Sequence, residues 1–296
     1  MNAKPSTEER VWAVLAHLSA LAMGMGLLLP IIGWSESRRK SNYTSFQCLQ
    51  ALGYQTLGYT IWILTTLVVV VVSSLAAIAD LVNATNLEEE AMRVASAHTG
   101  LSFVLIGIYF LLPIVAGITC ALGRDFRYPF MGNQLARYLG YKQNGEENSW
   151  LTEEHEDRWV ASTGHFAVII ILWGLLAPIS AWVMQGRRSL FLRFQSIQTV
   201  GYQVGTMLLY VVAGFFYVVG LAVFFLTIGF QGNITFDSTM ILIGAIISLA
   251  SLLFSMLIIL AVPLLHILGQ WAGYRVLKGD DYRYPIVGRL VEKWAK

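Results

Sequence analysis

Charged residues are scarce in this chain of 296 residues: Asp, Glu, Lys and Arg together make up only 13% of it, against 56% hydrophobic residues. A soluble domain carries about 25% charged residues, so this composition is that of a protein built for lipid. Cysteine is also scarce. Cys48 and Cys120 lie in or next to apolar segments at unmatched positions, which argues against a disulfide framework or a metal site. We interpret both as packing residues.

The common catalytic motifs are absent as well. The sequence contains no Gly-rich phosphate loop, no His-Glu-x-x-His, no Gly-x-Ser-x-Gly and no Cys-x-x-Cys. Its carboxylates cluster in polar stretches rather than in the apolar segments, so no paired acid–base site is visible. We therefore predict that the protein is not an enzyme, that it uses no cofactor or metal, and that it binds no nucleic acid.

Long apolar stretches dominate what is present. Six of them contain no charged residue: 11–35, 46–79, 94–123, 159–186, 194–236 and 238–274. About 20 residues suffice for a helix to cross the hydrocarbon core, so each stretch is long enough in principle. Their apolar character is continuous, without the alternation that marks the strands of a membrane barrel. The sequence predicts an all-α, multi-pass membrane protein.

An internal duplication organises the chain. Residues 9–55 recur at 157–203 without a gap, and 17 of the 47 positions are identical. Each copy ends on a similar phrase, Asp-Phe-Arg-Tyr-Pro at 125–129 and Asp-Tyr-Arg-Tyr-Pro at 281–285. Both copies should therefore share one fold. We predict a first membrane repeat at 1–141, a polar cytoplasmic linker at 142–157 and a second membrane repeat at 158–296.

The positive charges distinguish two topologies. If all six stretches cross the membrane, the 20 Lys and Arg divide 12 against 8, which is no bias. If the first stretch of each repeat instead enters and returns on one side, 19 of the 20 share a face and only Arg93 lies opposite. The positive-inside rule prefers the second arrangement. It predicts that most basic loops face the cytoplasm of a prokaryotic inner membrane.

Helix-breaking residues in both first stretches support this re-entry. Gly24, Gly26 and Pro30 interrupt the first, and Gly174 and Pro178 interrupt the second. Proline removes an amide donor, and broken backbone at membrane depth survives only when it is buried in protein or lines a cavity. We favour two broken, re-entrant segments with four full spans at about 47–79, 98–123, 197–230 and 240–274. Six ordinary spans remain the alternative.

Polar side chains kept in both copies mark the candidate sites. His17 and His165 can relay protons or bind a ligand, or they can hold helices together by hydrogen bonds, and we favour the structural role. The same choice, between a polar groove and an interhelical hydrogen-bond seam, applies to the stripes that open the next helix. We favour the seam. These stripes consist of Gln47, Gln50, Tyr54 and Gln55, and of Gln195, Gln198, Tyr202 and Gln203.

The repeated Arg-Tyr-Pro phrase has a different interpretation. Tyrosine and arginine suit the headgroup zone of a bilayer, and proline favours the first position of a new helix. We therefore predict interfacial anchors at Arg127, Tyr128 and Pro129, and at Arg283, Tyr284 and Pro285.

The order of these motifs resembles a known family. The phrase Glu-Arg-Val-Trp-Ala-Val-Leu-Ala-His-Leu at 9–18 is followed by Pro30 and Trp34, basic residues, a Gln-rich helix start and Arg-Tyr-Pro. This order is similar to that of small bacterial membrane proteins related to the Tic-type chloroplast import component, a grouping that includes the magnetosome proteins MamF and MmsF. Members are usually single modules, so the tandem form is a departure. The resemblance implies a role in protein translocation or in organising an organelle membrane.

These observations favour a non-catalytic scaffold or assembly subunit that works through helix–helix contacts. Its expected partners are the lipid bilayer and either membrane proteins or further copies of the chain. The alternative is a transport or channel module with its pathway at the repeat interface. A magnetosome-type membrane organiser ranks third, because the acidic run Glu88–Glu90 is short for that role.

Overall fold

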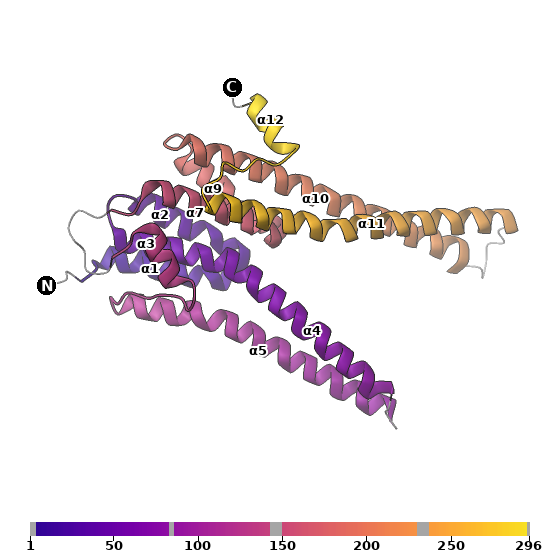
Figure 1. Ribbon diagram of the computed structural model, residues 1–296. Helices are drawn as coiled ribbons and strands as arrows, with labels where there is room; N and C mark the ends of the chain where they lie inside the picture. Colours follow the sequence, from indigo (N-terminus) through magenta and orange to yellow (C-terminus); the bar gives the residue numbers. More distant parts are fainter. Residues whose placement is uncertain (1–3, 83–85, 143–149, 230–236, 295–296) are drawn as a thin grey trace.

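The computed structural model describes residues 4–82, 86–142, 150–229 and 237–294, and within these ranges every regular element is a helix (Figure 1). This confirms the predicted all-α fold with two tandem repeats. The elements of the first repeat are α1 (Thr7–Leu18), η1 (Ser19–Leu27), α2 (Leu28–Ser37), α3 (Asn42–Gly53), η2 (Tyr54–Gly58), α4 (Tyr59–Val82), α5 (Leu87–Ala121) and α6 (Gly132–Leu139). Those of the second are α7 (Glu153–Phe166), η3 (Ala167–Ile170), α8 (Ile171–Gly174), α9 (Leu176–Gln185), α10 (Leu190–Phe224), η4 (Phe225–Gly229), α11 (Ser238–Leu277) and α12 (Val287–Trp294).

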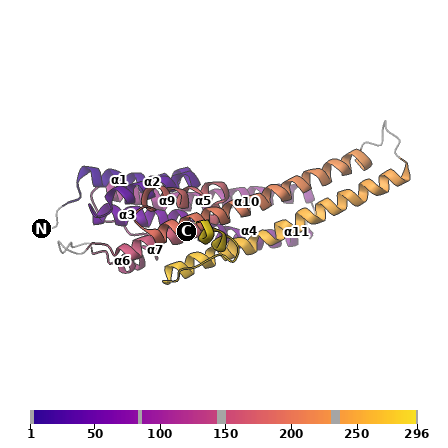
Figure 2. The ribbon, with the colours of Figure 1, turned by 90° about the horizontal axis from the view of Figure 1, so that it is seen from above.

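Two arms extend from a shared head. The head contains the first segments of both repeats, and the helix pairs α4–α5 and α10–α11 leave it in diverging directions (Figures 1 and 2). The long helices begin at side chains that cap free amides: Asn86 caps α5, Ser189 caps α10 and Asp237 caps α11. The predicted linker lies partly outside the described residues, and α7 begins inside it, at Glu153.

Five helical stretches are long and apolar enough to cross a membrane: Thr7–Ser37, Asn42–Val82, Leu87–Ala121, Leu190–Thr227 and Ser238–Leu277. A sixth candidate, Glu153–Gly174 with Leu176–Gln185, is bent by 115° at its break. The chain is thus a multi-pass helical membrane protein. Length and composition alone do not say whether the first stretch of each repeat crosses.

The backbone shows that both first segments fold back. Met23 has φ 50° and ψ −134°, and Ile171, the equivalent residue 148 positions later, has φ 45° and ψ −119°. After the first bend the chain returns to the beginning of α1. The contact that shows this is a hydrogen bond at 2.5 Å, which the Ser41 hydroxyl donates to the Glu9 carboxylate. A straight helix of 31 residues would separate its ends by about 46 Å. This geometry agrees with re-entry, and the side that each loop faces stays a prediction.

Glycine makes each bend possible. A Cβ atom on Gly26 would lie 1.9 Å from the carbonyl oxygen of Ser19, and one on Gly174 would lie 2.1 Å from that of Ala167. Pro30 and Pro178 lie in the first turns of α2 and α9, where proline is tolerated. The break therefore lies beside the glycines named from the sequence, Gly24, Gly26 and Gly174, and before the two prolines.

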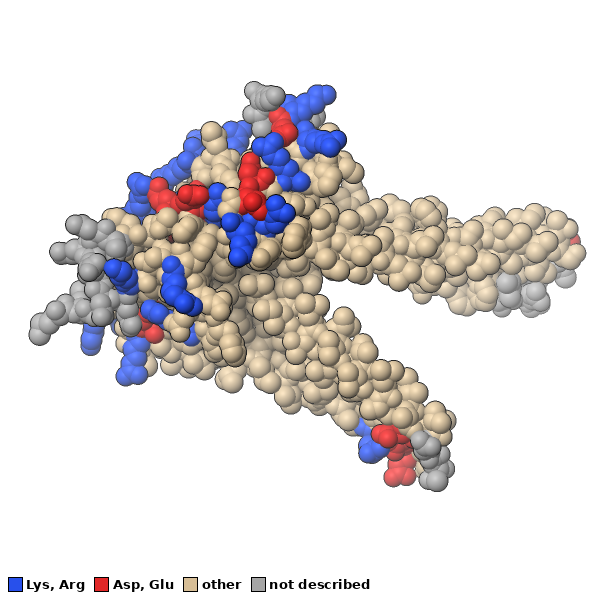
Figure 3. Space-filling view, in the orientation of Figure 1, with Lys and Arg blue, Asp and Glu red and all other residues tan. Residues whose placement is uncertain are grey.

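Charge separates the two ends of the molecule. Figure 3 shows Lys and Arg gathered over the head, whereas the arms are almost free of charge up to their tips. At the tip of the α4–α5 arm, Arg93 pairs with Glu90 and Asp80. The three-dimensional distribution therefore follows the 19-to-1 division of basic residues in the sequence.

Candidate functional site: a duplicated histidine–glutamine–tyrosine network

His17 is the centre of a polar network inside the apolar head. It is fully buried, and its Nε2 lies 2.9 Å from Gln47 Oε1 and its Nδ1 3.1 Å from the Tyr128 hydroxyl. Because an amide oxygen only accepts, Nε2 carries the proton and donates to Gln47, and the tyrosine hydroxyl donates to Nδ1. The contacts fix the imidazole as one neutral tautomer with both nitrogens engaged.

The glutamine pair connects this histidine to the loop after α5. Gln47 Nε2 donates to Asp125 Oδ1 at 2.6 Å and to the carbonyl of Phe126 at 3.1 Å. Gln50 Nε2 donates to the same carbonyl at 2.9 Å, and its Oε1 accepts from the amide of Tyr128 at 2.8 Å. The two side chains thus provide hydrogen-bond partners for backbone groups of the loop. Leaving these groups unpaired in an apolar setting would be costly.

The second repeat builds the same network. His165 Nε2 lies 3.1 Å from Gln195 Oε1, and its Nδ1 lies 3.0 Å from the Tyr284 hydroxyl. Gln195 Nε2 donates to Asp281 Oδ1 at 2.8 Å. The remaining members occupy equivalent places, with Gln198 donating to the carbonyl of Tyr282 at 2.7 Å. Sequence reasoning named both histidines and the glutamines, and the structure brings each set together.

The other residues of the polar stripes lie beside these networks. The Tyr54 ring stacks on Tyr128 at 4.3 Å between centroids, and Tyr202 stacks on Tyr284 at 3.9 Å. Gln55 Nε2 donates to the carbonyl of Ala16, at the end of α1, at 3.2 Å. Its counterpart Gln203 donates to the carbonyl of Gly164 at 3.0 Å. Each stripe therefore joins the first segment of its repeat to the helix that follows.

The interfacial role predicted for the two tyrosines of Arg-Tyr-Pro is wrong. Tyr128 is 3% exposed and Tyr284 is 1% exposed, because each hydroxyl is needed by a buried histidine. Arg127 and Arg283 remain partly exposed and pair with Asp125 and Asp281. For these arginines the anchoring role stays a prediction. Pro129 and Pro285 are exposed, as are the apolar residues directly after them, Phe130 and Ile286, so an anchoring role for the prolines stays a prediction.

Sequence reasoning missed the residues that join the two repeats. Trp34 Nε1 donates to Glu156 Oε1 at 3.0 Å, and Trp159 Nε1 donates to the carbonyl of Leu49 at 2.9 Å. Arg38 pairs with Glu156 and Asp157. A signal existed, because Trp159 and Arg38 are large residues whose counterparts in the other repeat are Val11 and Gly186. Two of these joining residues are thus departures from the repeat, whereas Trp34 and Glu156 have identical counterparts in Trp182 and Glu8.

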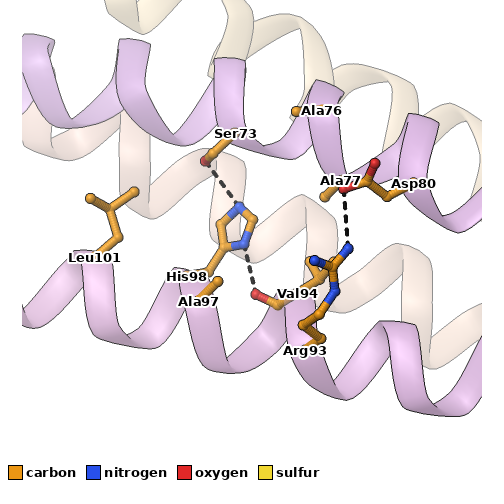
Figure 4. A pocket seen from close by; sticks show the side chains of 9 residues that line it. All are labelled: Ser73, Ala76, Ala77, Asp80, Arg93, Val94, Ala97, His98 and Leu101. Carbon is orange, nitrogen blue, oxygen red and sulfur yellow. Dashed lines mark hydrogen bonds and ion pairs between the residues drawn. The ribbon is translucent and has the colours of Figure 1, made fainter.

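The described residues offer little reactive chemistry. No group of three or more His, Cys, Asp or Glu side chains within them is placed to hold a metal ion. A cavity of about 200 Å³ lies between α4 and α5 (Figure 4), and the His98 beside it is held by Ser73 at 3.0 Å and by the carbonyl of Val94 at 2.9 Å. That histidine, like the two in the head, is occupied by neighbours within the chain.

Fold and network together define a class: a duplicated, multi-pass helical membrane protein whose repeats each close around a buried histidine. The sequence model of one family, described as the magnetosome magnetite crystal formation protein family (MamF/MmsF), matches the chain twice, over residues 8–135 and 156–291. The chain belongs to this family. The match supports the magnetosome side of the sequence resemblance and not its import-type side. Neither the curated proteins nor the solved structures contain a significant match.

Proposed function

We propose that this protein is a non-catalytic membrane scaffold that serves magnetite crystal formation in a magnetosome-type membrane. Membership of the family supports the setting, since both repeats match its model. The scaffold role is supported by the architecture, in which two copies of one module hold their arms apart on a shared head. Such a protein presents long apolar helix surfaces to which other membrane proteins can pack.

The observation that carries this proposal is that the hydrogen bonds of both histidines are made within the protein. A channel or transporter needs polar groups that meet water or a substrate along a pathway. Here the nitrogens of His17 and His165 are bonded within their own repeats, and Gln47 and Gln195 are fully buried. Polar groups that are satisfied in this way stabilise the head and are not free to line a pathway, although Gln55 Oε1 and Gln203 Oε1 beside them are buried without a partner.

Flux through reconstituted protein tests the alternative. We expect purified protein in liposomes to conduct neither protons nor small ions between pH 5 and 8. The double variant His17→Gln with His165→Gln should lower thermal stability, because glutamine cannot reproduce both imidazole contacts, and should leave flux at the background of empty liposomes. Reproducible pH-dependent flux that the double variant abolishes would establish a channel and refute the scaffold.

Crystal formation in the source cell tests the setting. Deletion of the gene should change the size or number of magnetite crystals in electron micrographs while leaving iron uptake intact. Wild-type protein should restore them, and the His17→Gln, His165→Gln variant should restore them only to the extent that it accumulates in the membrane. Crystals of unchanged size and number in the deletion strain would contradict the proposed role in magnetite crystal formation.

A further inference from the structure

The open end of each re-entrant hairpin forms a pocket at the basic end of the molecule, of about 640 Å³ in the first repeat and about 310 Å³ in the second, and an arginine already lies in the second pocket. We call them the first and second mouths. In the second mouth, Arg38 Nε lies 3.2 Å from Glu156 Oε2, and its Nη2 lies 2.8 Å from Asp157 Oδ1. The side chains of Arg38 and Glu156 are 7% and 3% exposed. A guanidinium from repeat 1 therefore closes the hairpin of repeat 2.

The first mouth carries the same carboxylates and is open. The shift of 148 positions places Glu8 and Glu9 where repeat 2 has Glu156 and Asp157. With Trp12, Glu36 and Lys40 they line a cavity of about 640 Å³, in which Lys40 pairs with Glu36. Glu8 is exposed to solvent, whereas Glu156 is buried.

Repeat 2 has no arginine that makes the equivalent contact with repeat 1. The counterpart of Arg38 is Gly186, which has no side chain to offer. The counterpart of Trp34 is Trp182, and the two differ sharply in exposure, at 0% for Trp34 and 40% for Trp182. The arginine–carboxylate contact between the repeats is therefore one-sided, and no guanidinium of repeat 2 reaches the first mouth.

The helix face beside the first mouth is uncovered in the same way. On α7, Glu156, Trp159 and Thr163 are buried, and Trp159 packs against Gly53 of repeat 1. The equivalent α1 residues, Glu8, Val11 and Leu15, are all exposed. These positions follow i, i+3, i+7 spacing and form one stripe, charged at the mouth and apolar below it.

We propose that the first mouth binds an arginine-bearing segment of a partner protein, with the guanidinium between Glu8 and Glu9 as Arg38 lies between Glu156 and Asp157. A planar guanidinium suits two adjacent carboxylates better than an ammonium does, because its donors form a fixed fork. Trp12 offers the cation an aromatic face, as Trp34 does for Arg38 at 5.0 Å. This inference rests on the proposed scaffold function, since it names the chemistry by which a partner docks.

A peptide taken from the chain itself provides the probe. The segment 34–40, Trp-Ser-Glu-Ser-Arg-Arg-Lys, contains the tryptophan and arginine that fill the second mouth. We expect one peptide to bind per full-length chain in nanodiscs, as measured by calorimetry, because Arg38 already pairs with both carboxylates of the second mouth. Replacing both peptide arginines with citrulline, which keeps the shape but not the charge, should weaken binding at least tenfold. Replacing them with lysine should give an intermediate loss.

Variants of the protein locate the binding. Glu8→Gln with Glu9→Gln should weaken binding at least tenfold, and the control Glu88→Gln with Glu89→Gln makes the same charge change at the far end of α5 and should have no effect. Glu9 also caps α1 through Ser6, so Glu8→Arg provides a second variant that leaves the cap intact. We expect it to abolish binding with an unchanged melting temperature.

Three results would overturn the inference. The first is equal affinity for the citrulline peptide, and the second is wild-type binding by folded Glu8→Arg. The third is dimerisation of the chain that Glu8→Arg abolishes, which would assign the arginine to a second copy instead of a separate partner. Peptide binding through Glu8, with no partner recovered by cross-linking in cells, would leave the site standing and contradict the scaffold function alone.

Discussion

The hydroxyl of Tyr54 donates to the backbone carbonyl of Tyr109 at 2.6 Å. Tyr109 lies four residues before Pro113, which has no amide to offer that carbonyl within α5. In the second repeat Tyr202 donates to the carbonyl of Leu265 at 2.7 Å, but Gly269 stands in the position of Pro113 and supplies its own amide. The tyrosine is thus a replacement donor in one repeat and an additional donor in the other.

This difference predicts unequal costs for the same substitution. Tyr54→Phe leaves a buried carbonyl without a donor and should lower the free energy of unfolding by about 1.7 kcal/mol, the upper end for hydrogen bonds between membrane helices. Tyr202→Phe should cost about 0.6 kcal/mol, the average for such bonds. Thermal unfolding of each variant in detergent provides the comparison. Equal losses would mean that Pro113 does not set the role of Tyr54.

The glutamine pairs should be more sensitive than the tyrosines. Gln50→Leu removes the donor to the carbonyl of Phe126 and the acceptor for the amide of Tyr128 at once, so we expect a loss of about 1–3 kcal/mol. Gln198→Leu should act similarly, and both together should add, because the networks lie in separate repeats. The exposed Gln134 provides the control, since Gln134→Leu removes no network contact. An unchanged melting temperature of the double variant would contradict the interpretation of these glutamines as an interhelical hydrogen-bond seam.

The repeat made much of this fold and network accessible to sequence reasoning. A polar residue that is present in both copies of an apolar stretch is expected to form a buried hydrogen bond. This argument alone identified His17, Gln47 and Gln50 as hydrogen-bonded residues. Tyr128 was misplaced because tyrosine next to arginine also suits a bilayer interface, and the local sequence does not reveal that a distant histidine needs its hydroxyl. Contacts over 111 residues of separation leave no local pattern.

Residues unique to one repeat explain the rest of the shortfall. Residues shared by the two copies indicate contacts within each repeat, whereas Arg38 and Trp159 join the repeats and differ from their counterparts Gly186 and Val11. Gly24, Gly26 and Gly174 indicated the region of each bend, and only its precise position was not predicted. It lies at Met23, an apolar residue that gives no sign of a positive φ, and the nearby prolines lie in a position that helices tolerate.

The bend itself should depend on glycine. Gly26→Ala places a methyl group against the Ser19 carbonyl, and Gly174→Ala does so against that of Ala167, so each should cost about 1–3 kcal/mol or more. Gly107 provides the matched control within α5, where no atom lies within 4 Å of a new Cβ. Gly107→Ala should be neutral or stabilise the helix by up to about 1 kcal/mol. Normal folding of the Gly26→Ala protein would show that the hairpin turns elsewhere.

Asp125 should make stability depend on pH. Burial raises the pKa of its carboxyl above the ordinary value, although Arg127 and Gln47 lower it. A carboxyl with a raised folded-state pKa stabilises the fold fully below its unfolded pKa, and this contribution is lost as pH rises through the folded value. Asp125→Asn keeps an acceptor for Gln47 without the charge. Its melting temperature should therefore rise relative to wild type as the pH is raised above about 4, the ordinary carboxyl value, and a difference in melting temperature that does not change with pH would contradict this.

Accessibility of single cysteines should decide the membrane topology. Cys48 and Cys120 are buried, and their replacement by serine gives a background without reactive thiols. Because each first segment returns to its starting end, Lys40→Cys and Arg188→Cys should both react with an impermeant reagent only when it reaches the basic, cytoplasmic side. Glu88→Cys, at the tip of the α4–α5 arm, should react only from the opposite side. Labelling of positions 40 and 188 from different sides would show that the first segment of repeat 2 crosses the membrane, because an odd number of crossings must then lie between them.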